Sequence, residues 1–78
     1  MEETYNKYSI TPTPKVIYLL ITNGINFIHR KGLQSQRYRI FFIATPEYAE
    51  TLTEETGWYA CNENDGWDFD NWAALERH

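Results

Sequence analysis

The sequence predicts a small α+β domain, in which a three- or four-stranded antiparallel sheet carries one or two short helices packed on one face. Three observations favour this fold class. Apolar, β-branched and aromatic residues are concentrated in three short runs separated by turn sequences. A segment that begins with proline and is rich in glutamate follows these runs. The chain of 78 residues is long enough for one domain only.

The first fourteen residues are expected to form a flexible N-terminal arm. They are mostly polar, and the two prolines of the TPTP sequence at 11–14 favour an extended backbone and disfavour a helix. We therefore place a single α+β domain at residues 15–78 and treat residues 1–14 as a separate segment.

The apolar runs that follow this arm predict an antiparallel meander. Each run is rich in β-branched and aromatic residues, and the Asn23-Gly24 pair after the first run is a strong hairpin signal. The predicted order is strand 15–22, turn 23–24, strand 25–30, turn 31–36 and strand 37–44. Pairing these strands, with Arg30 opposite Arg37, produces one apolar face that suits a layer of helix.

The opposite face of this predicted sheet is also apolar. It carries six large side chains among its polar ones: Ile17, Leu19, Ile21, Ile28, Phe41 and Ile43. A face of this composition is not polar enough to be freely solvated. Two coverings remain open, namely a second helix of the same chain, or a partner or second copy.

A helix is predicted directly after the third strand. Thr45 can cap its free N–H groups, and Pro46 suits the first helical position. Glu47 and Glu50 are favourable near the positive end of the helix dipole. Gly57 is expected to end the helix.

The C-terminal residues are expected to contribute two further short elements. WYAC at 58–61 is a candidate fourth strand, and NENDG at 62–66 is typical of a turn. The last residues, 68–78, predict a short helix in which Asp68 or Asp70 is the N-cap.

Charge is distributed unevenly along the chain, whose formal net charge is −4. Residues 1–45 carry six Lys or Arg and two acids, whereas residues 46–78 carry nine acids and one arginine. Such an asymmetry bears on binding partners rather than on the fold.

Cysteine content and the lengths of the apolar runs indicate a soluble, cytoplasmic protein without a membrane anchor. Cys61 is the only cysteine, so an internal disulfide cannot form, as is usual in a reducing compartment. The N-terminus carries acids at positions 2 and 3, unlike a signal peptide. The runs VIYLLI and IFFIA are far shorter than the ~20 residues that span a bilayer.

No residue pattern indicates catalysis, and we expect neither enzyme activity nor a cofactor or metal. A nucleophile and its base would have to come from Cys61, His29 and the terminal His78, which the predicted elements do not bring together. These three residues are also too few for a closed zinc site. The acids around Gly66 do not fit a calcium loop, because Trp72 stands where the loop requires glutamate.

Acidic residues near the C-terminus alternate with aromatic ones. Carboxylates beside an indole suit a protein-binding surface, in which charge steers the encounter and tryptophan anchors the complex. We therefore predict that this half of the chain occupies a basic, nucleic-acid-binding groove of a larger protein. The candidate contacts are Glu54, Glu55, Glu63, Asp65, Trp67, Asp68 and Asp70.

Two other classes of partner remain open. A structural homodimer or complex subunit would bury the apolar second face, through Ile17, Leu19, Ile21, Phe41 and Ile43. Direct nucleic-acid binding is less favoured, because the acidic half would repel phosphates. It would use the basic hairpin at 29–39, with contacts from Arg30, Lys31, Arg37 and Arg39.

In being short, acidic, rich in aromatic residues and without catalytic motifs, the chain resembles inhibitors that phages encode, including anti-CRISPR and other anti-defence proteins. This resemblance lies in composition and assigns no site residue. It implies a non-enzymatic inhibitor that occludes a surface of a host protein in the host cytoplasm.

Overall fold

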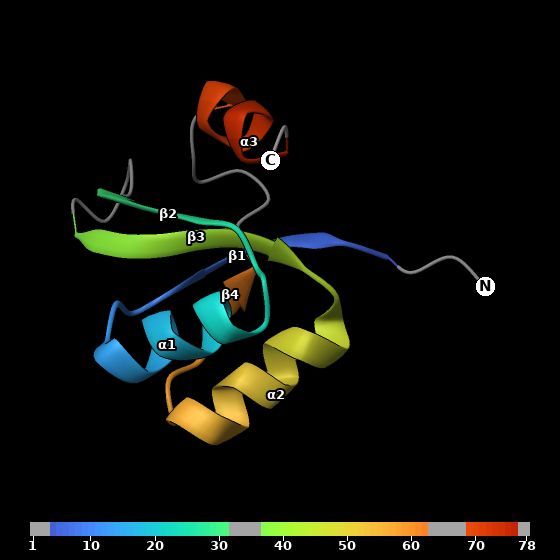
Figure 1. Cartoon of the computed structure of the whole chain (residues 1–78). Coiled ribbons are helices and arrows are strands. Elements are labelled where there is room, and N and C mark those ends of the chain that lie inside the picture. Colours follow the sequence, from blue (N-terminus) through green and yellow to red (C-terminus); the bar gives the residue numbers. More distant parts are fainter. Residues whose placement is uncertain (1–3, 32–36, 63–68, 77–78) are drawn as a thin grey trace.

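A computed structural model describes residues 4–31, 37–62 and 69–76 and confirms the α+β class (Figure 1). The described residues form four strands and three helices. In chain order these are β1 (Asn6–Ile10), α1 (Pro14–Thr22), β2 (Phe27–Lys31), β3 (Tyr38–Ala44), α2 (Pro46–Thr56), β4 (Cys61–Asn62) and α3 (Phe69–Glu76). Helices α1 and α2 cover one face of the sheet, and α3 lies on the other (Figure 1).

The four strands form one antiparallel sheet in the order β2-β3-β1-β4. Strand β1 therefore lies inside the sheet, hydrogen-bonded to β3 on one side and to β4 on the other. The expected flexible arm is wrong for residues 6–10, and the sheet is not a simple meander. Tyr8 and Ile10 alternate with polar residues and are both buried, so this short strand contributes to the core.

The segment predicted as the first strand is instead helix α1. Thr13 caps it, because its Oγ1 accepts a hydrogen bond from the Val16 backbone N–H at 3.2 Å, and Pro14 occupies the first helical position. Val16 and Leu20 are one turn apart and fully buried. The apolar run thus supplies one buried helix face rather than two faces of a strand.

The Asn23-Gly24 pair ends this helix rather than turning a hairpin. Asn23 donates its backbone N–H to the Leu19 carbonyl at 3.0 Å, and Gly24 has a positive φ of 69°. The Ile25 N–H then bonds to the Leu20 carbonyl at 2.9 Å. A glycine in the left-handed region is a common helix C-terminus, so the predicted hairpin turn is wrong and the pair ends α1.

Strands β2 and β3 pair as predicted, but in a different register. Arg30 lies opposite Arg39, whereas the sequence-based pairing placed Arg30 opposite Arg37. Because side chains alternate with a period of two residues, a shift of two residues leaves every side chain on its predicted face. Phe41 and Ile28 consequently share one face, as expected.

Helix α2 is confirmed, and the residues predicted to begin and end it do so. The Thr45 Oγ1 accepts from the Tyr48 N–H at 3.2 Å, Pro46 follows, and Gly57 adopts a φ of 77° at the C-terminus.

β4 overlaps the predicted fourth strand only at Cys61. Helix α3 confirms the predicted terminal helix, and Asp70 is its second residue rather than its cap. Asp68, the other expected cap, lies outside the described residues.

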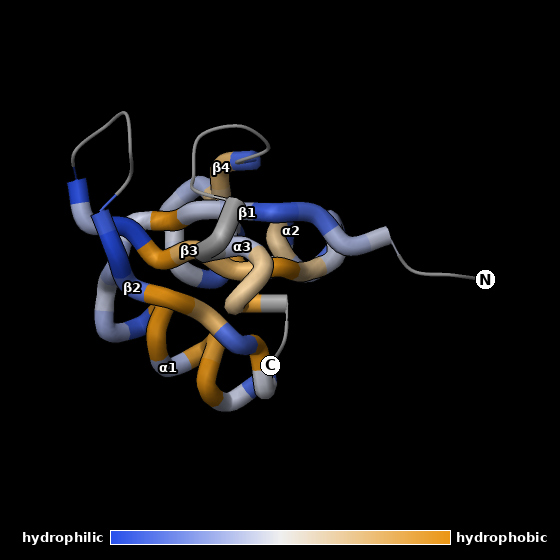
Figure 2. The backbone as a smooth tube through the Cα atoms, turned by 90° about the horizontal axis from the view of Figure 1, so that it is seen from above, coloured by the Kyte–Doolittle hydropathy of each residue, from blue (hydrophilic) through white to orange (hydrophobic). Residues whose placement is uncertain are grey.

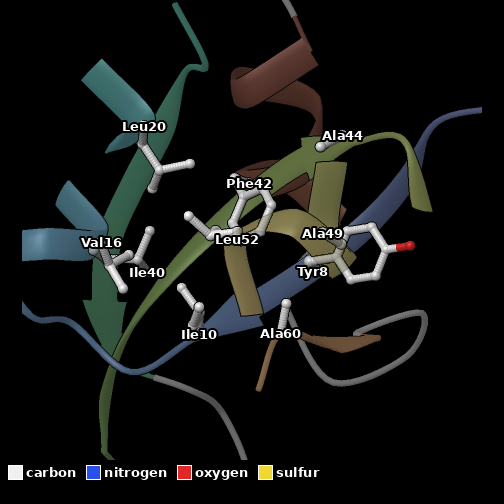
Figure 3. Packing of buried hydrophobic residues seen from close by; sticks show 10 residues of the cluster. All are labelled: Tyr8, Ile10, Val16, Leu20, Ile40, Phe42, Ala44, Ala49, Leu52 and Ala60. Carbon is white, nitrogen blue, oxygen red and sulfur yellow. The ribbon is translucent and has the colours of Figure 1, made fainter. Parts of the chain in front are cut away.

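The main core fills the space between the sheet and helices α1 and α2 (Figure 3). Its buried members are Tyr8, Ile10, Val16, Leu20, Ile40, Phe42, Ala44, Ala49, Leu52 and Ala60. A smaller cluster lies under α3, formed by Phe41, Trp72 and Leu75 with the partly buried Ile28 and Ile43. The second apolar face of the sheet is therefore covered by a helix of the same chain, α3, which is one of the two coverings left open by the sequence.

Candidate protein-binding surface

Helix α2 presents an exposed acidic stripe. Its buried side is formed by Ala49 and Leu52. Because an α-helix has ~3.6 residues per turn, Glu47, Glu50 and Glu54 fall on one stripe on the opposite side, and all three are exposed. No Lys, Arg or His occurs from residue 46 to residue 62, so this stretch supplies no compensating cation.

Glu55, also a predicted contact, lies on a different flank of the helix. It is exposed, and its charge acts on Tyr48, which contacts α1 through a hydrogen bond from its hydroxyl to the Leu19 carbonyl at 3.5 Å. Burial is the main cause that raises the pKa of Tyr48 above 10.0. Glu55 therefore faces the α1–α2 junction rather than the acidic stripe.

Two exposed aromatic residues follow directly after α2. Trp58 is 46% exposed and Tyr59 is 73% exposed. Their backbone is fixed against the helix by two threonines: Thr56 Oγ1 accepts from the Trp58 N–H at 3.2 Å, and Thr53 Oγ1 accepts from the Ala60 N–H at 3.1 Å. Aromatic rings held at a surface by a fixed backbone are suited to anchoring a partner.

An open depression of about 260 Å³ lies between α2 and the neighbouring strands. It is lined by Tyr8, Pro46, Ala49, Glu50, Thr53, Tyr59 and Ala60, and we call it the Tyr8–Tyr59 depression. Figure 3 shows Tyr8, Ala49 and Ala60 together at one end of the core, with the Tyr8 hydroxyl pointing away from the other labelled residues. The depression thus joins an acid of the stripe to the aromatic segment.

The predicted contacts that the structure describes do not form one surface. Glu54 belongs to the exposed stripe, and Asp70 lies in the first turn of α3. Glu63, Asp65, Trp67 and Asp68 lie outside the described residues. Sequence reasoning missed four residues of this surface, namely Glu47, Glu50, Trp58 and Tyr59, although an aromatic pair directly after a glutamate-rich helix is visible in the sequence.

The alternative dimer residues do not form one face. Ile17, Leu19 and Ile21 lie on helix α1, whereas Phe41 and Ile43 lie on the α3 side of strand β3. The prediction of a shared face is wrong because it assumed that residues 15–22 form a strand. Within α1, Ile21 is exposed, while Ile17 and Leu19 pack partly against the main core.

The basic residues are divided between the faces of the β2–β3 pair. Arg30 and Arg39 are opposite one another, on the face that α3 covers elsewhere, and Lys31 is opposite Tyr38 on the other face. Arg37 lies just before β3 and is exposed. Figure 2 shows β2 changing from apolar near its start to hydrophilic at its end.

Arg39 is the partly buried member of this basic set. Its Nε donates to Ser9 Oγ at 3.0 Å, and its Nη2 lies 3.7 Å from Cys61 Sγ. Its guanidinium thus links β3 to β1 and β4, which gives this cation a structural role.

The candidate nucleophile and base lie at opposite edges of the sheet. His29 is on the edge strand β2 and Cys61 is on the edge strand β4, with β3 and β1 between them. Three strand spacings separate them by ~14 Å, too far for a proton transfer between the two side chains. His78 lies outside the described residues, among which no group of three or more His, Cys, Asp or Glu side chains is placed to hold a metal ion.

In the part of the chain that the structure describes, none of the helices combines the length and the apolar character needed to cross a bilayer. Comparison of the chain with protein families, curated proteins and solved structures found no significant match.

Proposed function

We propose that this chain is a non-enzymatic protein-binding module that uses the acidic stripe of α2 and the aromatic residues after it to occupy a basic surface of a larger protein. One observation carries this proposal: three exposed glutamates lie on one side of a helix that the exposed Trp58 and Tyr59 follow directly, in a stretch without any cation. Charge complementarity steers association, and exposed aromatic residues provide the anchoring contacts.

The acidic stripe also indicates what such binding would achieve. A basic groove that accepts carboxylates is the kind of surface that holds a phosphate backbone. Occupying it would exclude nucleic acid by steric and electrostatic means, without chemistry. In this proposal the module is an inhibitor of the kind that phages encode, acting in the cytoplasm, where a lone thiol such as Cys61 remains reduced.

The test compares capture by single-site variants. The immobilised chain is incubated with a lysate of the native host, and bound proteins are identified by mass spectrometry. We expect Glu54→Lys and Trp58→Ala to lose the proteins that the unchanged chain retains, and we expect ~1 M salt to release them, since the Debye length is then about 3 Å.

Glu55→Lys is the matched control, because it makes the same change of charge on the flank that faces Tyr48. Circular dichroism establishes that each variant is folded. Retention of the same proteins by folded Glu54→Lys and Trp58→Ala variants would refute the proposed surface.

A further inference from the structure

The Tyr8–Tyr59 depression is smaller than a typical ligand pocket. Its volume is about 260 Å³, and it is open to solvent. Sites for drug-sized molecules and cofactors usually occupy roughly 300–1,000 Å³ and enclose most of the ligand. The depression therefore suits a single side chain that enters from a partner.

The lining of the depression combines two tyrosines with one carboxylate. Tyr8 is 7% exposed and stacks on Phe42, with ring centroids 5.7 Å apart, so its ring is held in place. Tyr59 is largely exposed and lines the same depression. Glu50 adds the negative charge.

The remaining polar group of the lining is already engaged within the fold. The Thr53 hydroxyl donates to the Ala49 carbonyl at 2.9 Å and accepts from the Ala60 N–H at 3.1 Å. Because it is committed in this way, Thr53 is not the group that selects a ligand. Glu50 is left as the charged group that can do so.

The lysine of strand β1, Lys7, points away from the depression. Lys7 of β1 lies over the Trp72 ring, with Nζ 5.7 Å from its centroid, on the side of the sheet that α3 covers. Tyr8, the next residue, points to the opposite side, toward α2. Since residues 46–62 contain no cation either, the Glu50 carboxylate can accept one from a partner.

We propose that the Tyr8–Tyr59 depression binds one arginine side chain of the partner. A planar guanidinium can stack on a tyrosine ring and at the same time donate two hydrogen bonds to a carboxylate. Lysine offers a point charge without this planar match. This inference rests on the proposed function, since it names the side chain that the acidic surface would recognise.

The experiment titrates the ¹⁵N-labelled chain with arginine amide, using citrulline amide and lysine amide as comparison probes, and follows backbone amide shifts by NMR. With arginine amide we expect saturable shifts at Ala49, Glu50, Thr53 and Ala60. Citrulline has a similar shape without the charge, so it should produce none of them.

Two variants test the assignment, and a third is the control. Glu50→Gln should weaken arginine amide binding roughly tenfold, because it removes a charge-assisted hydrogen bond. Tyr59→Ala should weaken it several-fold through the lost ring contact. Glu55→Gln removes the same charge from the flank of the same helix that faces Tyr48, outside the lining of the depression, and its effect should be less than about twofold.

Three outcomes overturn the assignment: equal binding of lysine amide, binding of citrulline amide, or equal effects of Glu50→Gln and Glu55→Gln. This experiment is independent of the capture of host proteins. If capture depends on Glu54 and Trp58 while arginine amide does not bind, only the arginine assignment fails. If arginine amide binds but capture is insensitive to the stripe, only the proposed function fails.

Discussion

The two faces of the sheet are packed very differently. On one face, ten buried residues from β1, β3, α1, α2 and the segment before β4 form a continuous core. On the other face, the buried cluster consists of Phe41, Trp72 and Leu75 under α3, counted over the described residues. Strand β3 supplies both faces, since Phe42 and Phe41 point to opposite sides and both are fully buried. The difference therefore comes from what covers each face.

Helix α3 is attached by a few specific contacts. The Phe41 and Trp72 rings meet edge to face, with centroids 5.9 Å apart and an interplanar angle of 86°. Lys7 lies over the same indole. Such contacts are each worth roughly 0.5–1.5 kcal/mol beyond the area that they bury. We therefore expect the main core to determine whether the chain folds, and the small cluster under α3 to determine whether α3 is docked.

The largest expected effect is that of Phe42→Ala. Phe42 is fully buried between Tyr8 of β1 and the helix layer, so truncation leaves a cavity at the centre of the main core. We expect a loss of about 3–5 kcal/mol in the free energy of unfolding. For a domain of this size such a loss approaches the whole stability, and urea denaturation followed by circular dichroism would measure it. A loss below about 1 kcal/mol would contradict the assignment of this face as the main core.

A smaller effect is expected from Trp72→Ala, although tryptophan is the larger side chain. Trp72 is 3% exposed, but it belongs to the small cluster under α3 and not to the main core, so we expect α3 to detach without opening the main core. We expect a loss of roughly 1–3 kcal/mol. Amide hydrogen exchange should show loss of protection in Phe69–Glu76, while Val16, Leu20 and Leu52 stay protected.

Exchange that rises together in α1, α2 and α3 of the Trp72→Ala variant would show that both faces unfold as one unit. That result would contradict the expectation that α3 detaches independently of the main core. Leu75→Ala is a matched second variant, because Leu75 is buried in the same small cluster and contributes no aromatic contact. Leu75→Ala should also cause loss of amide protection in α3 alone. Its loss in the free energy of unfolding should be smaller than that of Trp72→Ala.

The elements that sequence reasoning predicted correctly are those defined by local signals. Helix α2 has its cap, its proline and its left-handed glycine within the helix or next to it. The apolar run at 15–22 has equally local signals, with Thr13-Pro14 before it and Asn23-Gly24 after it, but the same residues are also typical of an extended linker and a hairpin turn, which is the prediction made from the sequence. A short run of apolar residues satisfies a strand and a helix about equally well, so the caps should have decided between them.

Strand β1 and the Tyr8–Tyr59 depression could not be predicted from local pattern. β1 has only two buried apolar residues, Tyr8 and Ile10, and it is a strand because β3 and β4 pair with its two edges. The depression forms because this pairing brings Tyr8 next to α2. Both depend on contacts between residues far apart in sequence, which no periodicity within one segment encodes.

The smallest expected effect concerns Tyr48, at the junction of α1 and α2. It tests how well the main core under these two helices is shielded from water. Burial raises the pKa of Tyr48, so the folded chain holds the phenol proton more strongly than the unfolded chain does. The corresponding stability is fully present below the ordinary value of 10.0 and is lost as the pH rises through the higher folded pKa. Unfolding free energies measured from pH 9 to about 11.5 should therefore fall more steeply for the unchanged chain than for Tyr48→Phe.

Tyr59→Phe is the control for this pH dependence, because it removes the same hydroxyl group from a largely exposed position away from the α1–α2 junction. Equal slopes for the unchanged chain and Tyr48→Phe would mean that water reaches the Tyr48 hydroxyl and that the α1–α2 junction opens readily. The main core would then be less well shielded from water than its ten buried residues indicate. Its packing would differ less from that of the small cluster under α3.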